Sequence, residues 1–191
     1  PDGPYLAYTD TIAPRFITSA LLAAIDHRRR TGTGHIIEAA QLECGLQLMT
    51  PELLDFQIND VKPTRIGNRD LNIAPQGIYP VKGDDRWIGI TIQDDASWTV
   101  LQTLMGNPDW AKEKEYETTA GRIDAADLID QQIAEWTNGY EGKELESRLV
   151  GSGIPAGIVA RSSDLLADPQ YEHLSFYRWH QHGAMGQVPY A

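Results

Sequence analysis

Cysteine is almost absent from the sequence, and this absence limits what the protein can be. Cys44 is the single cysteine among 191 residues, so neither an internal disulfide nor a cysteine-based zinc site can form. Long hydrophobic runs are missing as well, and no segment approaches the roughly 20 apolar residues that a membrane-spanning helix needs. The single cysteine suits a reducing compartment, and we expect a cytoplasmic protein that does not bind membranes.

Basic residues are also scarce. The sequence has 16 Lys and Arg against 27 Asp and Glu, which gives a formal net charge of −11. Such a chain is repelled by phosphate backbones, so nucleic acid is not an expected partner. Residues 84–147 hold most of the excess, with 15 acidic and five basic side chains. This pattern is typical of solvated helix faces, and the alternative is an acidic docking surface.

Common catalytic and nucleotide-binding motifs are missing too. Neither a GxxxxGK[ST] phosphate loop nor a GxSxG elbow occurs, and Gly151–Gly153 lacks the third glycine of a dinucleotide fingerprint. His180 and His182 could share one face of a strand, but no third ligand is evident, so no metal is expected. Cys44 lies in an apolar helical stretch, which is typical of a small core residue.

The N-terminal third of the chain has a clear helical pattern. Apolar residues at helical spacing predict a long helix over Asp10–Arg30, with three arginines in its last turn and Gly32 after its end. A short strand is predicted over His35–Ala39. A second helix is predicted over Gln41–Phe56, with a bend or restart at Pro51.

The rest of the chain alternates between loops, strands and helices. Residues 57–76 are predicted to form a long loop because proline, glycine and asparagine recur there. Two strands, Gly77–Val81 and Arg86–Ile92, are predicted to form a hairpin. The remaining predicted elements are a helix capped by Asp94 or Asp95, helices over Ile123–Trp136 and Lys143–Val150, a strand over Ile154–Ala160 and a helix that starts at Ser163–Ala167. The pattern favours an α/β fold class, with a middle α+β unit of roughly residues 63–148 inserted between two α/β ends.

Asp10 is the strongest candidate for a catalytic residue. It stands at the predicted start of the first long helix, where an aspartate often only caps the backbone. The same helix end carries positive partial charge and free N–H groups, which favour an ionised carboxylate. An exposed ionised carboxylate can act as a nucleophile toward an acyl carbon. Position alone therefore leaves two roles for Asp10, a helix cap and a nucleophile.

Short motifs follow one another in a specific order along nearly the whole chain. They are Tyr8–Asp10, Ala20–Ile25, Arg28–Gly34, Arg65–Asn68, Ala74–Pro80, Asp85–Ile90, Gly153–Val159 and Asp168–Pro169. In order and spacing, this set resembles the family III CoA-transferases, also called the CaiB/BaiF family.

The resemblance implies a reaction and a role for Asp10. In that family, an aspartate at the start of the helix before the TGxG turn carries the acyl group, and Asp10 occupies this position, 21 residues before Thr31. The implied activity is an acyl-CoA:carboxylate CoA-transferase that works through a mixed anhydride and an aspartyl-CoA thioester. The implied partners are an acyl-CoA and a carboxylic acid. No permanently bound cofactor is implied, since the CoA thioester is a substrate, and the implied assembly is an interlocked homodimer.

The resemblance also implies a domain organisation. The chain is similar to part of a Rossmann-like large domain with an inserted smaller α+β domain. Residues 1–60 are expected to be a large-domain segment with the nucleophile helix, residues 61–150 the smaller domain, and residues 151–191 a return segment to the large domain. Most CoA contacts of the family lie in a part that precedes this chain.

Three residues of the long loop are candidates for substrate binding. Arg65 and Arg69 could each bind a carboxylate through a two-pronged guanidinium contact, and the alternative is pairing with acids such as Asp60 and Asp70. Gln76 could donate its amide to a substrate carboxylate or oxyanion, and the alternative is packing within the loop. We expect the loop over residues 65–77 to line the acyl or acceptor side of the site and to move during turnover.

Two other functions remain open at this point. One is an α-methylacyl-CoA racemase of the same family, in which the matching aspartate works with a histidine located before Pro1. The other is a catalytically inactive fragment that serves only in folding and dimerisation. An acylated Asp10 would separate the enzyme from the inactive module.

Overall fold

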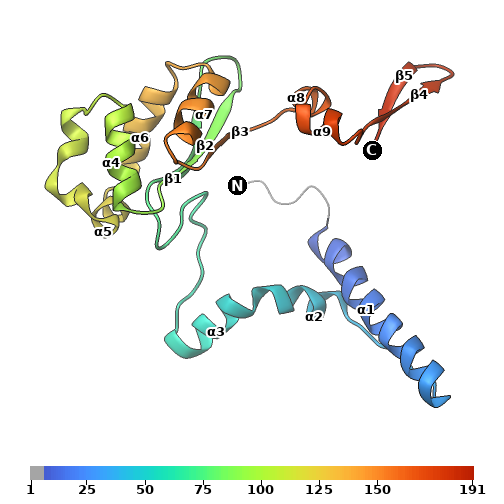
Figure 1. Cartoon of the computed structure of the whole chain (residues 1–191). Helices are drawn as coiled ribbons and strands as arrows, with labels where there is room; N and C mark the ends of the chain where they lie inside the picture. Colours follow the sequence, from blue (N-terminus) through green and yellow to red (C-terminus); the bar gives the residue numbers. More distant parts are fainter. Residues whose placement is uncertain (1–6) are drawn as a thin grey trace. The chain divides into compact units, whose positions relative to one another are not determined.

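The computed structural model describes residues 7–191, and the chain divides between Gly67 and Asn68 into two units. Unit 1 ends at Gly67 and unit 2 runs from Asn68 to Ala191 (Figure 1). The boundaries expected from the sequence, near residues 60 and 150, differ from this division. The strand that follows residue 150 pairs within unit 2, so residues 151–191 are grouped with the middle of the chain. Their return to a larger domain stays a prediction.

Unit 1 begins with the helix α1, Tyr8–Thr31. Arg28–Arg30 in its last turn complement the negative helix end, and Gly32 ends it in the left-handed conformation at φ 78°. This confirms the predicted helix, whose start lies two residues earlier than expected. Pro14 therefore falls in the second turn rather than the first, and it offers no N–H to the carbonyl of Asp10.

The second predicted helix is broken into three pieces. They are α2 over Gln41–Leu46, the 3₁₀ turn η1 over Gln47–Met49 and α3 over Thr50–Asn59. Pro51 occupies the first turn of α3, so the predicted restart is confirmed. Cys44 is buried, as expected of a core residue. The strand predicted over His35–Ala39 is wrong, because among residues 7–191 this segment has no neighbouring strand to share a hydrogen-bond ladder.

Unit 2 is built on a three-stranded antiparallel sheet in the order β1-β2-β3. Its strands are β1 over Gln76–Pro80, β2 over Trp87–Thr91 and β3 over Ala156–Ile158. β1 and β2 form the predicted hairpin, with Ile78 opposite Gly89. β3 adds to the other edge of β2 with Gly157 opposite Gly89, which confirms the predicted strand.

Helices and a second hairpin make up the rest of unit 2. The helices are α4 over Asp95–Leu104, η2 over Asp109–Lys112, η3 over Lys114–Glu117, α5 over Thr119–Asp124, α6 over Ala126–Thr137, α7 over Gly142–Gly151, α8 over Ser162–Leu166 and α9 over Pro169–His173. The hairpin joins β4 over Arg178–His182 to β5 over Gly186–Tyr190. The carboxylate of Asp94 accepts the Ser97 N–H at 2.7 Å, so the predicted cap of α4 is confirmed. No helix within residues 7–191 is long and apolar enough to cross a membrane.

The core of unit 2 lies between the sheet and helices α4, α6 and α7. Its fully buried members alternate along β2, as in Ile88 and Ile90, and recur at helical spacing along α6, as in Ile129 and Ile133. The mixed α/β class is therefore confirmed for this unit.

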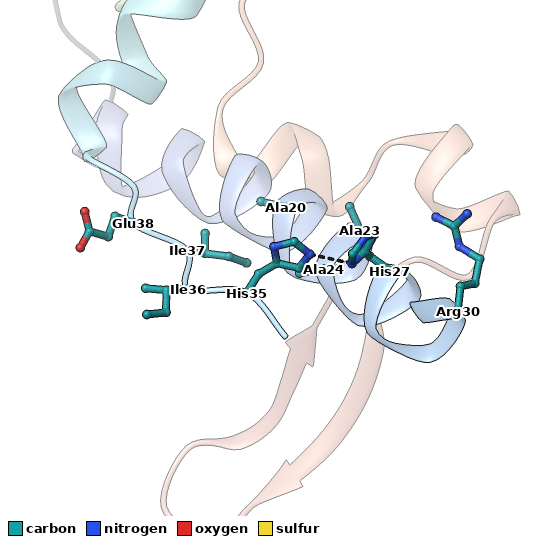
Figure 2. Close-up of a pocket in the computed structure, with 9 residues that line it drawn as sticks. All are labelled: Ala20, Ala23, Ala24, His27, Arg30, His35, Ile36, Ile37 and Glu38. Carbon is teal, nitrogen blue, oxygen red and sulfur yellow. Dashed lines mark hydrogen bonds between the residues drawn. The ribbon is translucent and has the colours of Figure 1, made fainter. Parts of the chain in front are cut away.

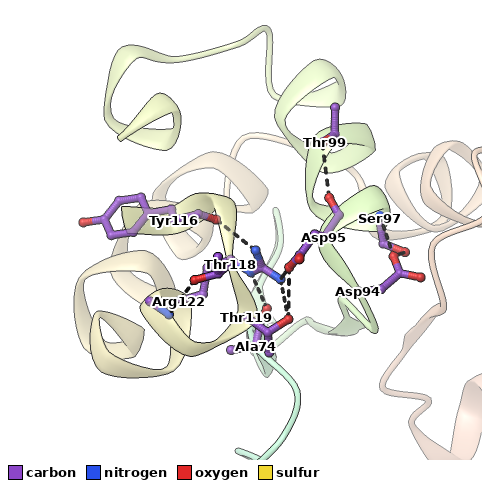
Figure 3. Close-up of polar contacts among 10 residues, drawn as sticks. Ala74, Asp94, Asp95, Ser97, Thr99, Tyr116, Thr118, Thr119 and Arg122 are labelled. Carbon is purple, nitrogen blue, oxygen red and sulfur yellow. Dashed lines mark hydrogen bonds and ion pairs between the residues drawn. The ribbon is translucent and has the colours of Figure 1, made fainter. Parts of the chain in front are cut away.

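A buried arginine ties the elements of unit 2 together. Arg122 on α5 has no solvent exposure, and its guanidinium donates to Asp95 Oδ1 at 2.8 Å. It also donates to the carbonyls of Ala74 and Tyr116 and to Thr119 Oγ1 (Figure 3). The guanidinium carbon lies 5.5 Å from the ring centre of Trp98. One side chain thus connects the loop before β1 to α4, η3 and α5.

Candidate active site

Asp10 is an exposed carboxylate in the first turn of α1. It is the third residue of the helix, and Ala7 is the N-cap. Asp10 is therefore not the helix cap, which was one of the two roles that the sequence left open for it. The carboxylate lies beside the N–H groups that a helix start leaves without backbone partners, and these favour negative charge there. Asp10 can thus be reached from solvent.

The start of α1 is held by its packing on α2. Gly45 lies so close to Thr9 that a Cβ on Gly45 would sit 3.2 Å from the methyl carbon of Thr9. Ala13, one turn further along α1, is buried, and so are Cys44 and Gly45. A small residue on α2 therefore lets the helices approach closely next to Asp10. This contact fixes the helix turn that carries the carboxylate.

A groove of about 620 Å³ lies along the other half of α1 (Figure 2). After Gly32 the chain folds back along the helix, and His35 Nε2 comes within 2.7 Å of His27 Nδ1. Ile37 lies toward the helix, whereas Ile36 points away and is 94% exposed. Sequence reasoning missed this histidine pair. The glycines of the turn at residues 32–34 were the available signal, because a tight reversal brings residue 35 back to the helix.

Arg69 forms ion pairs with two aspartates of unit 2. Its Nη2 lies 2.6 Å from Asp127 Oδ1 and 2.8 Å from Asp130 Oδ2, both on α6. Its Nε donates to the same Asp130 oxygen at 3.1 Å. The sequence suggested Asp60 and Asp70 as alternative partners, and the structure pairs Arg69 with two other acids.

Tyr79 completes this network from β1. Its hydroxyl donates to Asp130 Oδ1 at 2.8 Å, and its side chain is buried. Burial, together with the neighbouring Asp130 carboxylate, raises the pKa of Tyr79 far above its ordinary value. The hydroxyl therefore keeps its proton at physiological pH and remains a donor to Asp130.

Gln76 and Arg65 differ in how the structure holds them. Gln76 is half-buried at the start of β1, and its amide Nε2 donates to the carbonyl of Asn68 at 3.1 Å. Arg65 is exposed and forms no ion pair or hydrogen bond with any other residue of the described range 7–191. Gln76 and Arg69 thus belong to one anchored segment of unit 2, whereas Asp10 and Arg65 belong to unit 1.

The two C-terminal histidines fall on one face of β4. His182 Nδ1 accepts the N–H groups of Ala184 and Met185, and the His180 ring packs edge-on against Tyr190. Within the described part of the chain, no three His, Cys, Asp or Glu side chains are grouped so that they could hold a metal ion.

Comparison with known proteins gives one consistent family. The model of "CoA-transferase family III" matches residues 1–191. The chain is 30% identical over 162 residues to succinyl-CoA--D-citramalate CoA-transferase of Chloroflexus aurantiacus, covering 85% of this chain and 40% of that protein. It is 30% identical to succinyl-CoA:mesaconate CoA-transferase of Haloarcula marismortui, covering 78% and 36%. It is 25% identical to succinate--glutarate CoA-transferase of Agrobacterium fabrum, covering 90% and 44%.

Solved structures show the same fold. A CaiB/BaiF family protein from Brucella suis superimposes with a TM-score of 0.82 at 23% identity. The match covers 98% of this chain and 52% of that one. The chain therefore spans about half of this matched structure and less than half of the curated relatives named above.

Proposed function

The chain belongs to CoA-transferase family III, and we propose that it supplies the nucleophile of an acyl-CoA:carboxylate CoA-transferase. One observation carries the proposal. Asp10 is an exposed carboxylate in the first turn of α1, and it occupies the place at which the resemblance expects the acyl-carrying aspartate. The tight contact between Thr9 and Gly45 supports it, because a nucleophile must be held in a fixed position.

The proposed reaction has four balanced steps. The Asp10 carboxylate attacks the donor acyl carbon, which gives a mixed anhydride and CoA thiolate. The thiolate attacks the Asp10 carbonyl, which forms an aspartyl-CoA thioester and releases the donor acid. The acceptor carboxylate then attacks this carbonyl, giving a second anhydride and CoA thiolate again. The thiolate finally attacks the acceptor acyl carbon, and the acceptor leaves as its CoA ester with Asp10 restored.

The local electrostatics suit this sequence of steps. Asp10 alternates between a charged carboxylate and neutral acyl forms, and the helix start favours the charged form that begins and ends the cycle. Exposure lets a large thioester reach the carboxylate.

We infer a dicarboxylic substrate from the relatives. The three named above act, by their names, on succinyl-CoA or succinate together with D-citramalate, mesaconate or glutarate. The proposed donor is succinyl-CoA, and the proposed acceptor is a second short dicarboxylic acid. Gln76 is the proposed contact to it, since it retains one amide N–H, and Arg65, which has no ion pair within residues 7–191, is a separate candidate.

The proposed assembly follows from the family as well. Unit 1 and the part of residues 151–191 that follows β3 would belong to a Rossmann-like large domain, and the middle of the chain together with β3 would be the inserted smaller domain. The complete enzyme would be an interlocked homodimer. Unit 1 leaves large apolar side chains on α1 exposed, such as Leu21 and Leu22, which supports a further covering partner for this helix.

An isotope experiment tests the mechanism. The purified full-length protein is incubated with succinyl-CoA and a dicarboxylic acceptor whose carboxylates carry ¹⁸O. In the proposed reaction one acceptor oxygen stays on Asp10 in each turnover and later leaves in the released succinate. Peptide mass spectrometry should find ¹⁸O on Asp10 and in succinate. Label in neither place contradicts the proposal, and deuterium uptake from D₂O at the acyl α-carbon would indicate the racemase instead.

A further inference from the structure

The segment Asn68–Gln76 is held on unit 2 by a cluster of four side chains that we call the Arg69 clamp. Its members are Arg69, Tyr79, Asp127 and Asp130. The clamp connects the beginning of the segment, at Arg69, to β1 just after its end, at Tyr79, through one carboxylate on α6.

Asp130 is the centre of the clamp. Its Oδ2 accepts both Nε and Nη2 of Arg69, at 3.1 and 2.8 Å, and its Oδ1 accepts the Tyr79 hydroxyl at 2.8 Å. A carboxylate with a charged partner on one oxygen and a buried hydroxyl on the other is held in one orientation. Asp127 adds only a single contact to Arg69, and its side chain is 94% exposed.

Gly77 makes this geometry possible. A Cβ at Gly77 would lie 2.8 Å from both Cζ and the hydroxyl oxygen of Tyr79, so the Tyr79 ring passes directly over the bare backbone of residue 77. A side chain at this place would push the hydroxyl away from Asp130. The residue next to Gln76 is therefore part of what holds Tyr79 on the clamp.

The charge of the clamp argues against a direct role in binding an acid. Arg69 contributes one positive charge and the two aspartates contribute two negative charges, so the cluster has a net charge of about −1. Nε and Nη2, which form one edge of the guanidinium, are both occupied. A carboxylate that approached Arg69 would meet two carboxylates already in place.

The clamp is connected to Gln76 through the backbone. The Gln76 amide donates to the carbonyl of Asn68, the residue directly before Arg69. At the other end, Gln76 begins the strand that carries Tyr79. Fixing Arg69 and Tyr79 on one carboxylate therefore fixes both neighbours of the Gln76 side chain.

We propose that Arg69 is a positioning residue, which acts through Asp130 and Tyr79 to hold Gln76 in the orientation that receives the acceptor acid. This inference rests on the proposed CoA-transferase function. It assigns to Arg69 a role different from the direct carboxylate contact expected from the sequence.

The direction in which Asp130→Asn changes the acceptor KM distinguishes positioning by Arg69 from direct binding by Arg69. If Arg69 positions Gln76, Asp130→Asn and Arg69→Gln both raise the acceptor KM by about tenfold, since a misplaced contact is lost in each. If Arg69 binds the acid itself, Asp130→Asn removes a competing negative charge and leaves the acceptor KM unchanged or lower. The second result would overturn the inference.

The experiment uses the full-length protein with succinyl-CoA and a dicarboxylic acceptor. Acceptor KM and kcat are measured for Arg69→Gln, Asp130→Asn, the double variant and Tyr79→Phe, with Asp127→Asn as the matched control. We expect the double variant to resemble either single variant, because both remove the same link. Tyr79→Phe should raise the acceptor KM less, and Asp127→Asn should leave it within about twofold, since its acid is solvated.

A second readout distinguishes positioning from a general loss of structure. The donor acid leaves from the place that the acceptor acid later occupies, so Arg69→Gln and Asp130→Asn should slow both half-reactions, while the melting temperature stays near that of the wild type. Arg69→Lys should recover part of the acceptor KM because its ammonium still reaches Asp130. A lower melting temperature with unchanged acceptor KM would overturn the inference. If the wild-type protein transfers no CoA, the proposed function fails and the inference fails with it. If the wild-type protein transfers CoA and the variants have the same acceptor KM, the inference alone fails.

Discussion

Unit 1 and unit 2 bury very different amounts of their chains. Among residues 7–67 only Ala13, Cys44 and Gly45 are buried, whereas unit 2 has a continuous core of fourteen buried residues. Asp10, the candidate nucleophile, belongs to unit 1, which has little core, and the buried Arg122 belongs to unit 2. The candidate nucleophile and the main core are therefore separated along the sequence, and substitutions of Asp10 and of Arg122 should affect activity and stability separately.

The largest expected effect is on activity and comes from unit 1. Asp10→Ala should reduce CoA transfer by at least about a thousandfold, because no other group takes over the acyl carrier role. Stability should change by less than about 0.5 kcal/mol, since the carboxylate is exposed and Ala7 rather than Asp10 is the helix cap. Steady-state turnover and thermal melting measure the two quantities.

A matched change on the same helix controls for this prediction. Asp26 is exposed and, within residues 7–191, pairs only with Arg30 on the next turn, so Asp26→Ala should leave turnover intact. If Asp10→Ala kept wild-type turnover, Asp10 would not be the nucleophile.

The largest stability effect is expected in unit 2. Arg122→Met should destabilise the unit by about 2–4 kcal/mol, because the carbonyls of two buried residues, Ala74 and Tyr116, lose a charged donor. Chemical denaturation followed by tryptophan fluorescence reports on unit 2, which contains all five tryptophans. Hydrogen exchange in α1 should not change. Equal loss of protection in both units would show that they fold as one.

A smaller effect on activity is expected from the contact beneath Asp10. Gly45→Ala places a Cβ 3.2 Å from the Thr9 methyl, so α2 must shift slightly against the start of α1. We expect turnover to fall about three- to tenfold, since catalysis is sensitive to small displacements of the nucleophile. Gly34→Ala is the control, because its Cβ would meet nothing within 4 Å. Equal effects of the two changes would refute a positioning role for the contact.

The smallest effect concerns pH and again unit 2. Hydrogen bonds from Arg122 lower the pKa of Asp95, and those from the Arg161 backbone and from Arg86 lower the pKa of Asp164. A carboxyl whose pKa is lowered by folding contributes stability above its unfolded value, and this contribution disappears as the pH falls through the folded value. Unit 2 should therefore lose stability below about pH 4, and Asp164→Asn should flatten this part of the curve. An unchanged curve would contradict the assignment.

The elements predicted correctly are those with strong local signals. The long helix has helical apolar spacing, arginines in its last turn and Gly32 after it, and each of these acts within a few residues. The cap at Asp94 and the hairpin around Gly83 are similarly local. The error at His35–Ala39 has the opposite cause. A strand needs a partner, and nothing in the segment itself says whether a partner is present.

The contacts of the candidate site are long-range, which is why the sequence could not reveal them. Arg69 and Asp130 are separated by 61 positions, and the same holds for the fold of unit 2, where Arg122 and Ala74 are 48 positions apart. The sequence suggested the nearby Asp60 and Asp70 as partners of Arg69. In the folded chain Arg69 pairs with Asp127 and Asp130 instead. The hairpin β4–β5 was missed because its strands carry histidine, glutamine and arginine in place of alternating apolar residues.

The position of β2 in the middle of its sheet bears on how the protein is made. β1 and β2 leave the ribosome together and can pair at once, but Ile88 must wait for Ile158, about 70 residues later, before the second edge is covered. During that interval β2 presents an open edge, which is the kind of surface that pairs with other nascent chains. Substitutions in α4–α7 that slow their packing should therefore lower the yield of folded protein during synthesis more than its stability once folded.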